Sequence, residues 1–426
     1  MSASTAHPAK TASRRVLPSA TMLGAMALVL YYLIPVAMPP LGFSPHVLAV
    51  IAGFVLLLAH SSGEIKIQKY IIPLVFLGTA LFSILVAPNA PVPRTLHTWL
   101  VSLAAFWLMG NIFSLLPQKG LDVGVQTLLA LWILAAIAQV LIGEVAYIST
   151  WYGAPIVTVY ATGLTIFSNN AAIMLLPLLV WTLVFNLDRP DWRRSLLWLT
   201  GCAALYFTLS RAGWLALLIA MLVLALRVRG QPRQIRGLVL HLAFALLAAL
   251  VAWAAPTRID PYELGGERSA GRWGTLDSGG DYNSGGDYSG ATRLLTLHVA
   301  AKAATEYPLT GVGLGHFPDY FAKHRVEYLT GTDIDPRARI PPHNGYAQFV
   351  AEAGIPASLL LLLWLGWLLR RAAKSTEPAA LALQASIVGM AGWLLFHDGL
   401  YDRQLWILLG CATALGVKHL SLRRDL

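Results

Sequence analysis

The chain has 426 residues, of which 57% are hydrophobic and 12% charged, and its mean hydropathy is +0.62. A soluble domain carries about a quarter charged residues, so this composition excludes an ordinary water-soluble enzyme and indicates a membrane protein. The formal net charge of +10 does not indicate a nucleic-acid partner, because the basic residues gather at the ends of apolar runs, where they suit membrane topology and anionic membrane lipids.

Apolar runs long enough to cross a bilayer recur along the chain and predict about twelve transmembrane helices. The first run has no small-residue cleavage site, so it is expected to remain as a span. Cys202 and Cys411 fall inside spans, which argues against a disulfide framework or a thiolate metal site. The expected spans are 20–38, 43–60, 70–88, 95–116, 121–143, 169–187, 195–209, 212–229, 237–255, 355–370, 379–397 and 403–418.

The distribution of Lys and Arg predicts the orientation of these spans. With the N-terminus in the cytoplasm, 19 of the 31 Lys and Arg residues lie on the cytoplasmic side and 3 in short outer loops, while 9 lie in one long loop. Short cytoplasmic loops carry the excess of basic residues, whereas long loops translocate regardless of charge. Both termini are therefore expected in the cytoplasm and the long loop outside it.

Two segments interrupt the membrane pattern. Residues 144–168 contain several aromatic side chains and no Lys or Arg, which suits a segment lying at the outer membrane surface. Residues 256–354 form the long loop, and its Gly-rich stretch at 265–290 cannot bury a core and is expected to be mobile. A helix is expected at 291–306.

After a glycine turn at 311–315, a second helix is expected from about 342. No βαβ pattern occurs, so the fold class is an all-α polytopic membrane protein with one large, partly helical outer loop. Its expected divisions are a transmembrane bundle at 1–255, the loop at 256–354 and spans ten to twelve at 355–426.

The clearest chemical candidate stands at the start of the second helix. The prolines at 341–342 suit a helix start, and a histidine in the first turn would be kept neutral by the positive helix end. His343 is therefore a candidate general base for a hydroxyl group. Asn344, Gln348 and Glu352 follow at intervals of four and form a polar stripe. The alternative is a helix-capping histidine at the membrane surface.

Two arginines are candidates for binding an anion. Arg211 stands on the outer side at the start of a span, and Ser210 is the expected N-cap of that helix. Arg293 opens the helix expected at 291–306, where a cation is unfavourable unless an anion shares the site. Together they could hold a pyrophosphate. A snorkelling arginine and an exposed arginine at a helix start are the alternatives.

The remaining loop residues give weaker indications. Gly311, Gly313 and Gly315 let the backbone turn tightly near a ligand, although no dinucleotide fingerprint surrounds them. The aspartates of the outer loops lack the spacing of a cation site, so neither a metal nor a cofactor is expected. Basic residues that are candidates to contact an anionic acceptor, or that simply form a solvated surface, are Lys323, Arg325, Arg337 and Arg339.

These motifs resemble the O-antigen ligase and polymerase superfamily of bacterial membrane glycosyltransferases. Four stretches carry the resemblance, and together they span about 160–370. They are Ser-Arg at 210–211, the arginine helix leading to the glycine turn at 293–317, Pro-His-Asn with its stripe at 342–352, and 163–171, where asparagine replaces a proline that the family often shows.

The resemblance implies a fold of about twelve spans, GT-C-like, with one large periplasmic loop in the inner membrane of a Gram-negative bacterium. It implies transfer of O-antigen from undecaprenyl pyrophosphate to lipid A–core without a metal. Carried over to this sequence, His343 is the base and Arg211 and Arg293 hold the pyrophosphate, while Asn344 and Gln348 position the histidine or a sugar.

Three other functions remain open. An O-antigen polymerase uses the same donor with a second lipid-linked glycan as acceptor. A protein O-oligosaccharyltransferase tends to carry a sizeable extra C-terminal region, whereas this sequence stops shortly after the last span. A transporter would place ionisable residues within the spans, but polar residues here collect in one outer loop.

Overall fold

The computed structural model describes residues 71–115, 118–142, 168–188, 190–208, 210–254, 288–324, 341–401 and 403–422. Within these ranges every regular element is a helix and no β-strand occurs, as the sequence predicts. The elements are α3 (Ile71–Val86), α4 (Pro93–Leu115), α5 (Gln118–Ile142), α6 (Ser168–Asp188), α7 (Trp192–Phe207), α8 (Arg211–Val228), α9 (Pro232–Ala254), α10 (Tyr288–Glu306), α11 (Phe317–His324), α12 (Gly345–Ala373), α13 (Pro378–Trp393), the short 3-10 helix η4 (Gly399–Tyr401) and α14 (Arg403–Leu422).

Each expected span from 70–88 onward overlaps one of these helices, including the short one at 195–209, which is α7. Among the helices in the described residues, five have a stretch long and apolar enough to cross a membrane, namely α5, α6, α8, α9 and α12. The expected spans 20–38 and 43–60, and residues 144–167, lie outside the described residues. The structure therefore shows a helical membrane protein, while the total of twelve spans stays a prediction.

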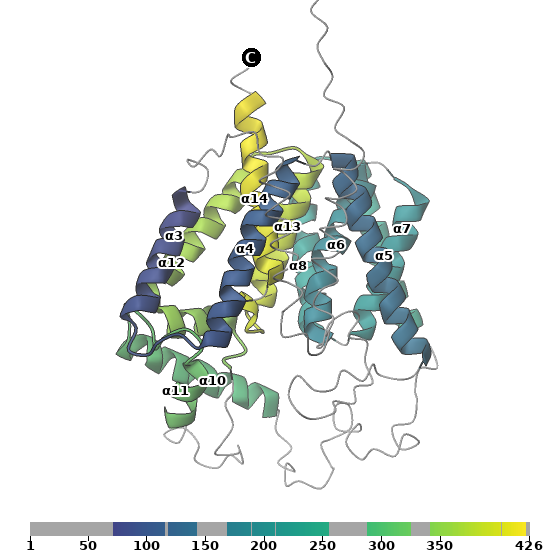
Figure 1. The fold of residues 1–426 in the computed structure, drawn as a ribbon. Coiled ribbons are helices and arrows are strands. Elements are labelled where there is room, and N and C mark those ends of the chain that lie inside the picture. Colours follow the sequence, from purple (N-terminus) through teal and green to yellow (C-terminus); the bar gives the residue numbers. More distant parts are fainter. Residues whose placement is uncertain are drawn as a thin grey trace, which may run out of the picture.

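Most helices stand side by side in a bundle, and α10 and α11 lie across one end of it (Figure 1). We call this the α10 end; the C-terminal end of α14 projects from the opposite end (Figure 1). Helices α4 and α14 pack closely because each has a glycine at the contact. A Cβ atom on Gly110 would lie 2.8 Å from the carbonyl oxygen of Gly410.

Helix α6 is the central helix of the bundle, since 94% of its span is buried and it packs against α5, α7, α8, α9 and α13. Helix α9 lies at the periphery, with only 22% of its span buried. Its outer face exposes Leu240, Leu246 and Leu250. A contiguous leucine face of this kind is unfavourable in water and is expected where the surrounding solvent is lipid.

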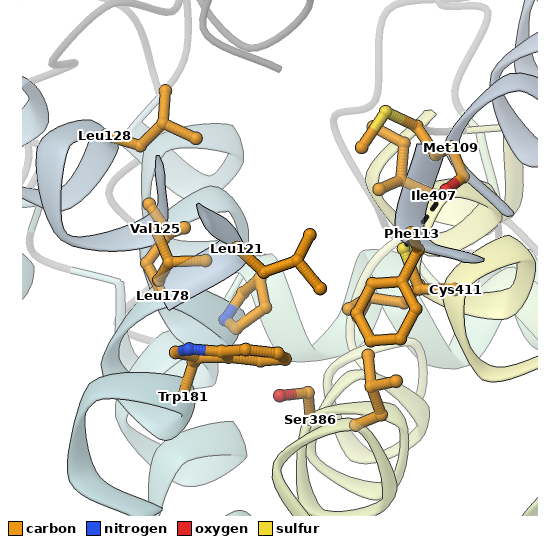
Figure 2. Close-up of a pocket in the computed structure, with 13 residues that line it drawn as sticks. Met109, Phe113, Leu121, Val125, Leu128, Leu178, Trp181, Ser386, Ile407 and Cys411 are labelled. Atoms are coloured by element: carbon orange, nitrogen blue, oxygen red, sulfur yellow. Dashed lines mark hydrogen bonds between the residues drawn. The ribbon is translucent and has the colours of Figure 1, made fainter. Parts of the chain in front are cut away.

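An apolar pocket opens among α4, α5, α6, α13 and α14 (Figure 2). It holds about 580 Å³ of space with its mouth included, and Phe113, Trp181 and Cys411 are among the side chains around it. Ser386 is the only hydroxyl among the residues that line it. Because its wall offers so few polar partners, this pocket does not fit a sugar or a phosphate.

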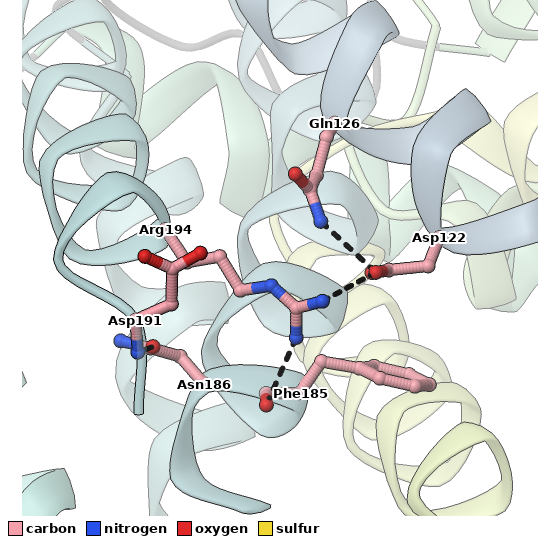
Figure 3. Close-up of polar contacts among 6 residues, drawn as sticks. All are labelled: Asp122, Gln126, Phe185, Asn186, Asp191 and Arg194. Carbon is pink, nitrogen blue, oxygen red and sulfur yellow. Dashed lines mark hydrogen bonds and ion pairs between the residues drawn. The ribbon is translucent and has the colours of Figure 1, made fainter. Parts of the chain in front are cut away.

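A polar cluster joins α5, α6 and α7 (Figure 3). Arg194 donates from Nη2 to Asp122 Oδ2 at 2.6 Å and from Nη1 to the carbonyl oxygen of Phe185 at 3.1 Å. Gln126 Nε2 donates to the same carboxylate oxygen at 3.0 Å. These contacts fasten three helices together, so we interpret this cluster as structural.

Candidate active site

Helix α12 is broken at Gly354, and the part of the helix before the break supports the site. Gly354 has φ +82°, and Pro356 has no N–H to donate, so the last carbonyls before the break lack their usual helical partners. The 311–315 turn supplies other donors. The amide of Val312 donates to the carbonyl oxygen of Ala351 at 2.8 Å, and that of Gly313 donates to Glu352 at 3.2 Å.

The glycines of the turn are required by this close packing. Gly311 has φ +67°, and a Cβ atom there would lie 2.6 Å from the amide nitrogen of Ala353. Gly313 and Gly315 also have positive φ, and the Gly315 amide donates to Glu352 Oε2 at 3.0 Å. Glu352 is 1% exposed, and this hydrogen bond shows that its carboxylate faces the turn. Four of the expected supporting residues, Gly311, Gly313, Gly315 and Glu352, thus hold the 311–315 turn against the first part of α12.

The start of α12 is fastened to the segment that follows α13. Asn344 is the N-cap: its Oδ1 accepts from the Ala347 amide at 2.9 Å, and its Nδ2 donates to the carbonyl oxygen of Leu395 at 3.0 Å. The Gly345 amide donates to the carbonyl oxygen of Leu394 at 2.8 Å. Residues 394–398 are thereby held beside residue 343.

Helix α10 joins the same assembly through Thr296, whose hydroxyl donates to the carbonyl oxygen of Pro342 at 3.0 Å. Thr296 is fully buried, so this bond fixes α10 against the Pro341–Pro342 segment. Gln348, on the first part of α12, is 7% exposed, and its Oε1 has no hydrogen-bond partner among the described residues. A buried amide oxygen without a partner is costly, which makes Gln348 a candidate to bind a ligand or a water.

The position of His343 differs from the expectation. The helix begins at Gly345 and not near 342, because Asn344 makes the capping hydrogen bond, so His343 precedes the cap and is not in the first turn. Its φ is +49°, a left-handed conformation that costs a residue with a Cβ about 1–2 kcal/mol. Strain of this kind is retained at functional sites more often than elsewhere.

Charges from three segments meet at this point: Arg293 and Asp398 act on His343, and Arg293 and His343 act on His397. We call these four side chains the His343 cluster. Burial lowers the pKa of His343, the Asp398 carboxylate raises it and the Arg293 guanidinium lowers it, with a net decrease. The neutral ring that the sequence predicts is thus supported, but burial and not the helix end is the main cause.

His397 is a second neutral imidazole in the cluster. Burial, followed by the charges of Arg293 and His343, lowers the pKa of His397 to about 4. Its ring stacks on Trp393, with centroids 4.5 Å apart and planes at 21°. The sequence predicts a span that reaches residue 397. Helix α13 instead ends at Trp393, so His397 lies beyond the helix.

The two arginines occupy different positions. Arg293 is in the His343 cluster. The sequence predicts that Arg293 opens its helix, but α10 begins at Tyr288, so Arg293 follows the first turn. Ser210 is confirmed as the N-cap of α8, since its Oγ accepts from the Gly213 amide at 3.2 Å. Arg211 is the first residue of α8 and is exposed.

Arg211 lies at the α10 end of the bundle. At the other end of α8, Arg227 donates to the carbonyl oxygens of Ala373 and Ser375, just before α13 begins. Helices α8 and α13 pack along each other, so α8 starts near the end of α13 where His397 follows. The described contacts do not join Arg211 to the His343 cluster directly.

The acceptor candidates are placed only in part. Lys323 is an exposed residue of α11, whereas Arg325, Arg337 and Arg339 lie outside the described residues. No group of three or more His, Cys, Asp or Glu that could hold a metal ion occurs in the described ranges. Sequence reasoning missed His397, which it expected at the end of a span, and Asp398 as site residues. The available signal was the place of Asp398 in a short loop on the expected outer side.

Fold and site together define a helical membrane protein with a half-buried histidine, an arginine and a carboxylate at one end of the bundle. The family model described as O-Antigen ligase matches residues 195–362, which run from α7 into α12 and include Arg211, Arg293 and His343. No curated protein matches the chain. The family match confirms the resemblance and supports an O-antigen ligase or polymerase-type membrane glycosyltransferase.

Proposed function

We propose that this protein transfers O-antigen polysaccharide from undecaprenyl pyrophosphate to lipid A–core at the periplasmic face of a Gram-negative inner membrane. The observation that carries the proposal is the His343 cluster, where a histidine with a lowered pKa lies within the electrostatic reach of a guanidinium group. A neutral imidazole is suited to take a proton, and a nearby cation is suited to a diphosphate.

In the proposed reaction, the neutral ring of His343 removes the proton from an acceptor hydroxyl. The hydroxyl oxygen forms a bond to the anomeric carbon of the donor sugar, and the bond from that carbon to the pyrophosphate oxygen breaks. Undecaprenyl pyrophosphate leaves with the electron pair, and a single direct displacement inverts the anomeric configuration. Arg293, with Arg211 at the same end, stabilises the charge that develops on the leaving group without a metal.

Asp398 has a distinct part in this proposal. Its carboxylate raises the pKa of His343, which means that it favours the protonated ring. The imidazolium that forms as the acceptor is deprotonated is therefore stabilised, as a carboxylate stabilises the histidine in other general-base sites. Burial and Arg293 act against protonation before the reaction and hold the ring neutral at rest, whereas Asp398 makes its protonation tolerable during transfer.

The distribution of basic residues supports the orientation. It assigns the α10 end to the periplasm, both termini to the cytoplasm, and the 256–354 loop to the outer side. Arg227 and the pair Arg370–Arg371 stand at the opposite end, as a cytoplasmic face requires. The hydrocarbon of membrane lipids then surrounds α9 and its exposed leucines.

Reconstitution of the purified protein with a lipid-pyrophosphate glycan and three acceptors tests the proposal. Lipid A–core should be modified, while a second lipid-linked glycan or an acceptor protein should not. His343→Ala should abolish transfer, and His298→Ala, which removes an exposed histidine from α10, should not. Product on the second lipid-linked glycan alone would identify a polymerase instead, which the family match also accommodates.

A further inference from the structure

A second pocket opens at the α10 end, outside the His343 cluster. It lies where the end of α10, helix α11 and the segment before α4 meet, and it holds about 1310 Å³ with its open mouth included. We call it the α10–α11 pocket, and the residues that matter for the argument are Glu306, Tyr307, Asp319, Tyr320, Lys323 and His324.

One wall of this pocket is aromatic and held in place. Tyr320 stacks on His324, with ring centroids 4.0 Å apart, and meets the Tyr307 ring edge-on at 6.4 Å. The hydroxyl of Tyr320 donates to Glu306 Oε2 at 2.6 Å. Phe317 and Phe321 lie fully buried beneath it, so the wall is preformed and needs little ordering when a ligand binds.

The charges of the pocket argue against a phosphate-bearing ligand. Two carboxylates, Glu306 and Asp319, face it with one ammonium group, that of Lys323. Lys302 Nζ lies 3.9 Å from Glu306 Oε1, and His316 Nδ1 lies 3.7 Å from Asp319 Oδ2. The pocket therefore has no cationic excess, whereas carboxylates are strong acceptors for hydroxyl donors and aromatic rings offer an apolar face.

We infer that the α10–α11 pocket binds a stretch of uncharged pyranose sugars in a glycan chain. The inference rests on the proposed function, which supplies the glycan. Glu306 lies 13 residues after Arg293 on the same helix, or about 20 Å along it. The pocket therefore contacts sugars several units away from the bond that forms at His343.

The pocket and the His343 cluster are connected through contacts with the first part of α12. Val312 lines the pocket, and its amide donates to the Ala351 carbonyl on the same part of α12 that Asn344 caps. A glycan held in the pocket would thus be held at a fixed distance from the base. Such a chain belongs either to the donor polysaccharide or to the outer, phosphate-free sugars of the acceptor core.

Binding of two soluble probes to the full-length protein in detergent tests the inference and separates these sources. One probe is lipid-free O-polysaccharide, and the other is core oligosaccharide released from lipid A, each labelled at its reducing end. The double variant Glu306→Gln/Asp319→Asn should weaken binding of the recognised probe at least tenfold, because it removes both charged acceptors. Ala322→Trp, which fills the pocket with a side chain, should do the same.

Thr305→Ala is the matched control, since Thr305 is exposed on α10 and does not line the pocket. It should bind the probe as the unmodified protein does, with all variants showing the same elution profile and thermal midpoint within a few degrees. Equal binding by the control and both pocket variants, or no binding of either probe, would overturn the inference. The binding assay measures no transfer, so it tests the inference separately from the proposed function. If the probe binds through the pocket but the protein shows no transferase activity, only the proposed function is refuted.

Discussion

Replacing Gly311 by alanine should detach the 311–315 turn from helix α12. The turn approaches the helix backbone so closely that a methyl group on Gly311 would overlap the carbonyl group of Glu352 and lie 2.6 Å from the Ala353 amide nitrogen. These neighbours are backbone atoms, which cannot move aside as the end of a flexible side chain can. The turn itself must therefore shift, and the amides of Val312 and Gly313 lose their acceptors on α12.

Three contributions set the size of the effect. A residue with a Cβ at φ +67° costs about 1–2 kcal/mol. Crowding in a well-packed site costs about 1–3 kcal/mol, and each lost backbone hydrogen bond about 1 kcal/mol. Because these terms overlap, we expect a loss of about 3 kcal/mol or more. The Glu352 carboxylate, which accepts from Gly315, would also lose its position under the candidate site.

Thermal unfolding of the purified protein in detergent measures this loss, and Gly366→Ala is the control on the same helix. Apart from its chain neighbours and the backbone of its own helix, no atom of the described residues lies within 4 Å of the site of a Cβ on Gly366, so alanine there should be neutral or stabilising by about 0.5–1 kcal/mol. Gly311→Ala should lower the thermal midpoint and the transfer rate together. If the two variants were equally stable, the account of how the turn anchors to α12 would be wrong.

Three further predictions concern the chemistry. Because the neutral form of His343 is needed, the transfer rate should stay high below pH 6.5 and fall only as the pH decreases through the lowered pKa of the ring. Asp398→Asn should move the midpoint of this fall to lower pH and Arg293→Gln to higher pH; shifts in the same direction would contradict the assigned charges. Arg211→Ala should weaken donor binding, measured with a labelled lipid pyrophosphate, and Arg211→Lys should restore it only partly, since lysine cannot bind bidentately; unchanged donor affinity in the alanine variant would exclude the role. Transfer should persist in excess chelator, and a loss restored by a divalent ion would disprove a metal-independent reaction.

The membrane helices were predictable because a continuous run of some twenty hydrophobic residues is visible in the sequence and depends on no tertiary contact. The span expected at 169–187 is α6, Ser168–Asp188, and the span expected at 212–229 is α8, Arg211–Val228. The N-cap at Ser210 was also predictable, since a serine before an apolar helix has one obvious local partner. Hydropathy and local capping therefore sufficed for these elements.

Helix starts in the long loop were harder to predict because they depend on single hydrogen bonds. Asn344 caps α12 while its amide group also donates to Leu395, a residue 51 positions away that no local pattern reveals. The capping hydrogen bond leaves His343 outside the helix, and the tertiary contact to Leu395 fixes the capping residue in place. Helix α10 begins inside the Gly-rich stretch, at Tyr288, which displaces Arg293 from the first turn.

The neighbours of His343 were not predictable for the same reason. His397 and Asp398 follow a span in a short loop, and nothing in their own sequence associates them with residues 293 and 343. Backbone contacts between Gly345 and Leu394 bring them together. The sequence thus indicated which residue types could do the chemistry, whereas the structure was needed to find which of them meet.

The rate of glycan transfer by purified His343→Ala in proteoliposomes, at saturating lipid-pyrophosphate donor and with lipid A–core as acceptor, tests the central claim most directly. Loss of a general base lowers a rate by about 10²–10⁴-fold, so the account predicts a loss of that size with unchanged donor affinity. A rate within a few fold of the unmodified protein would show that His343 does not take the proton from the acceptor.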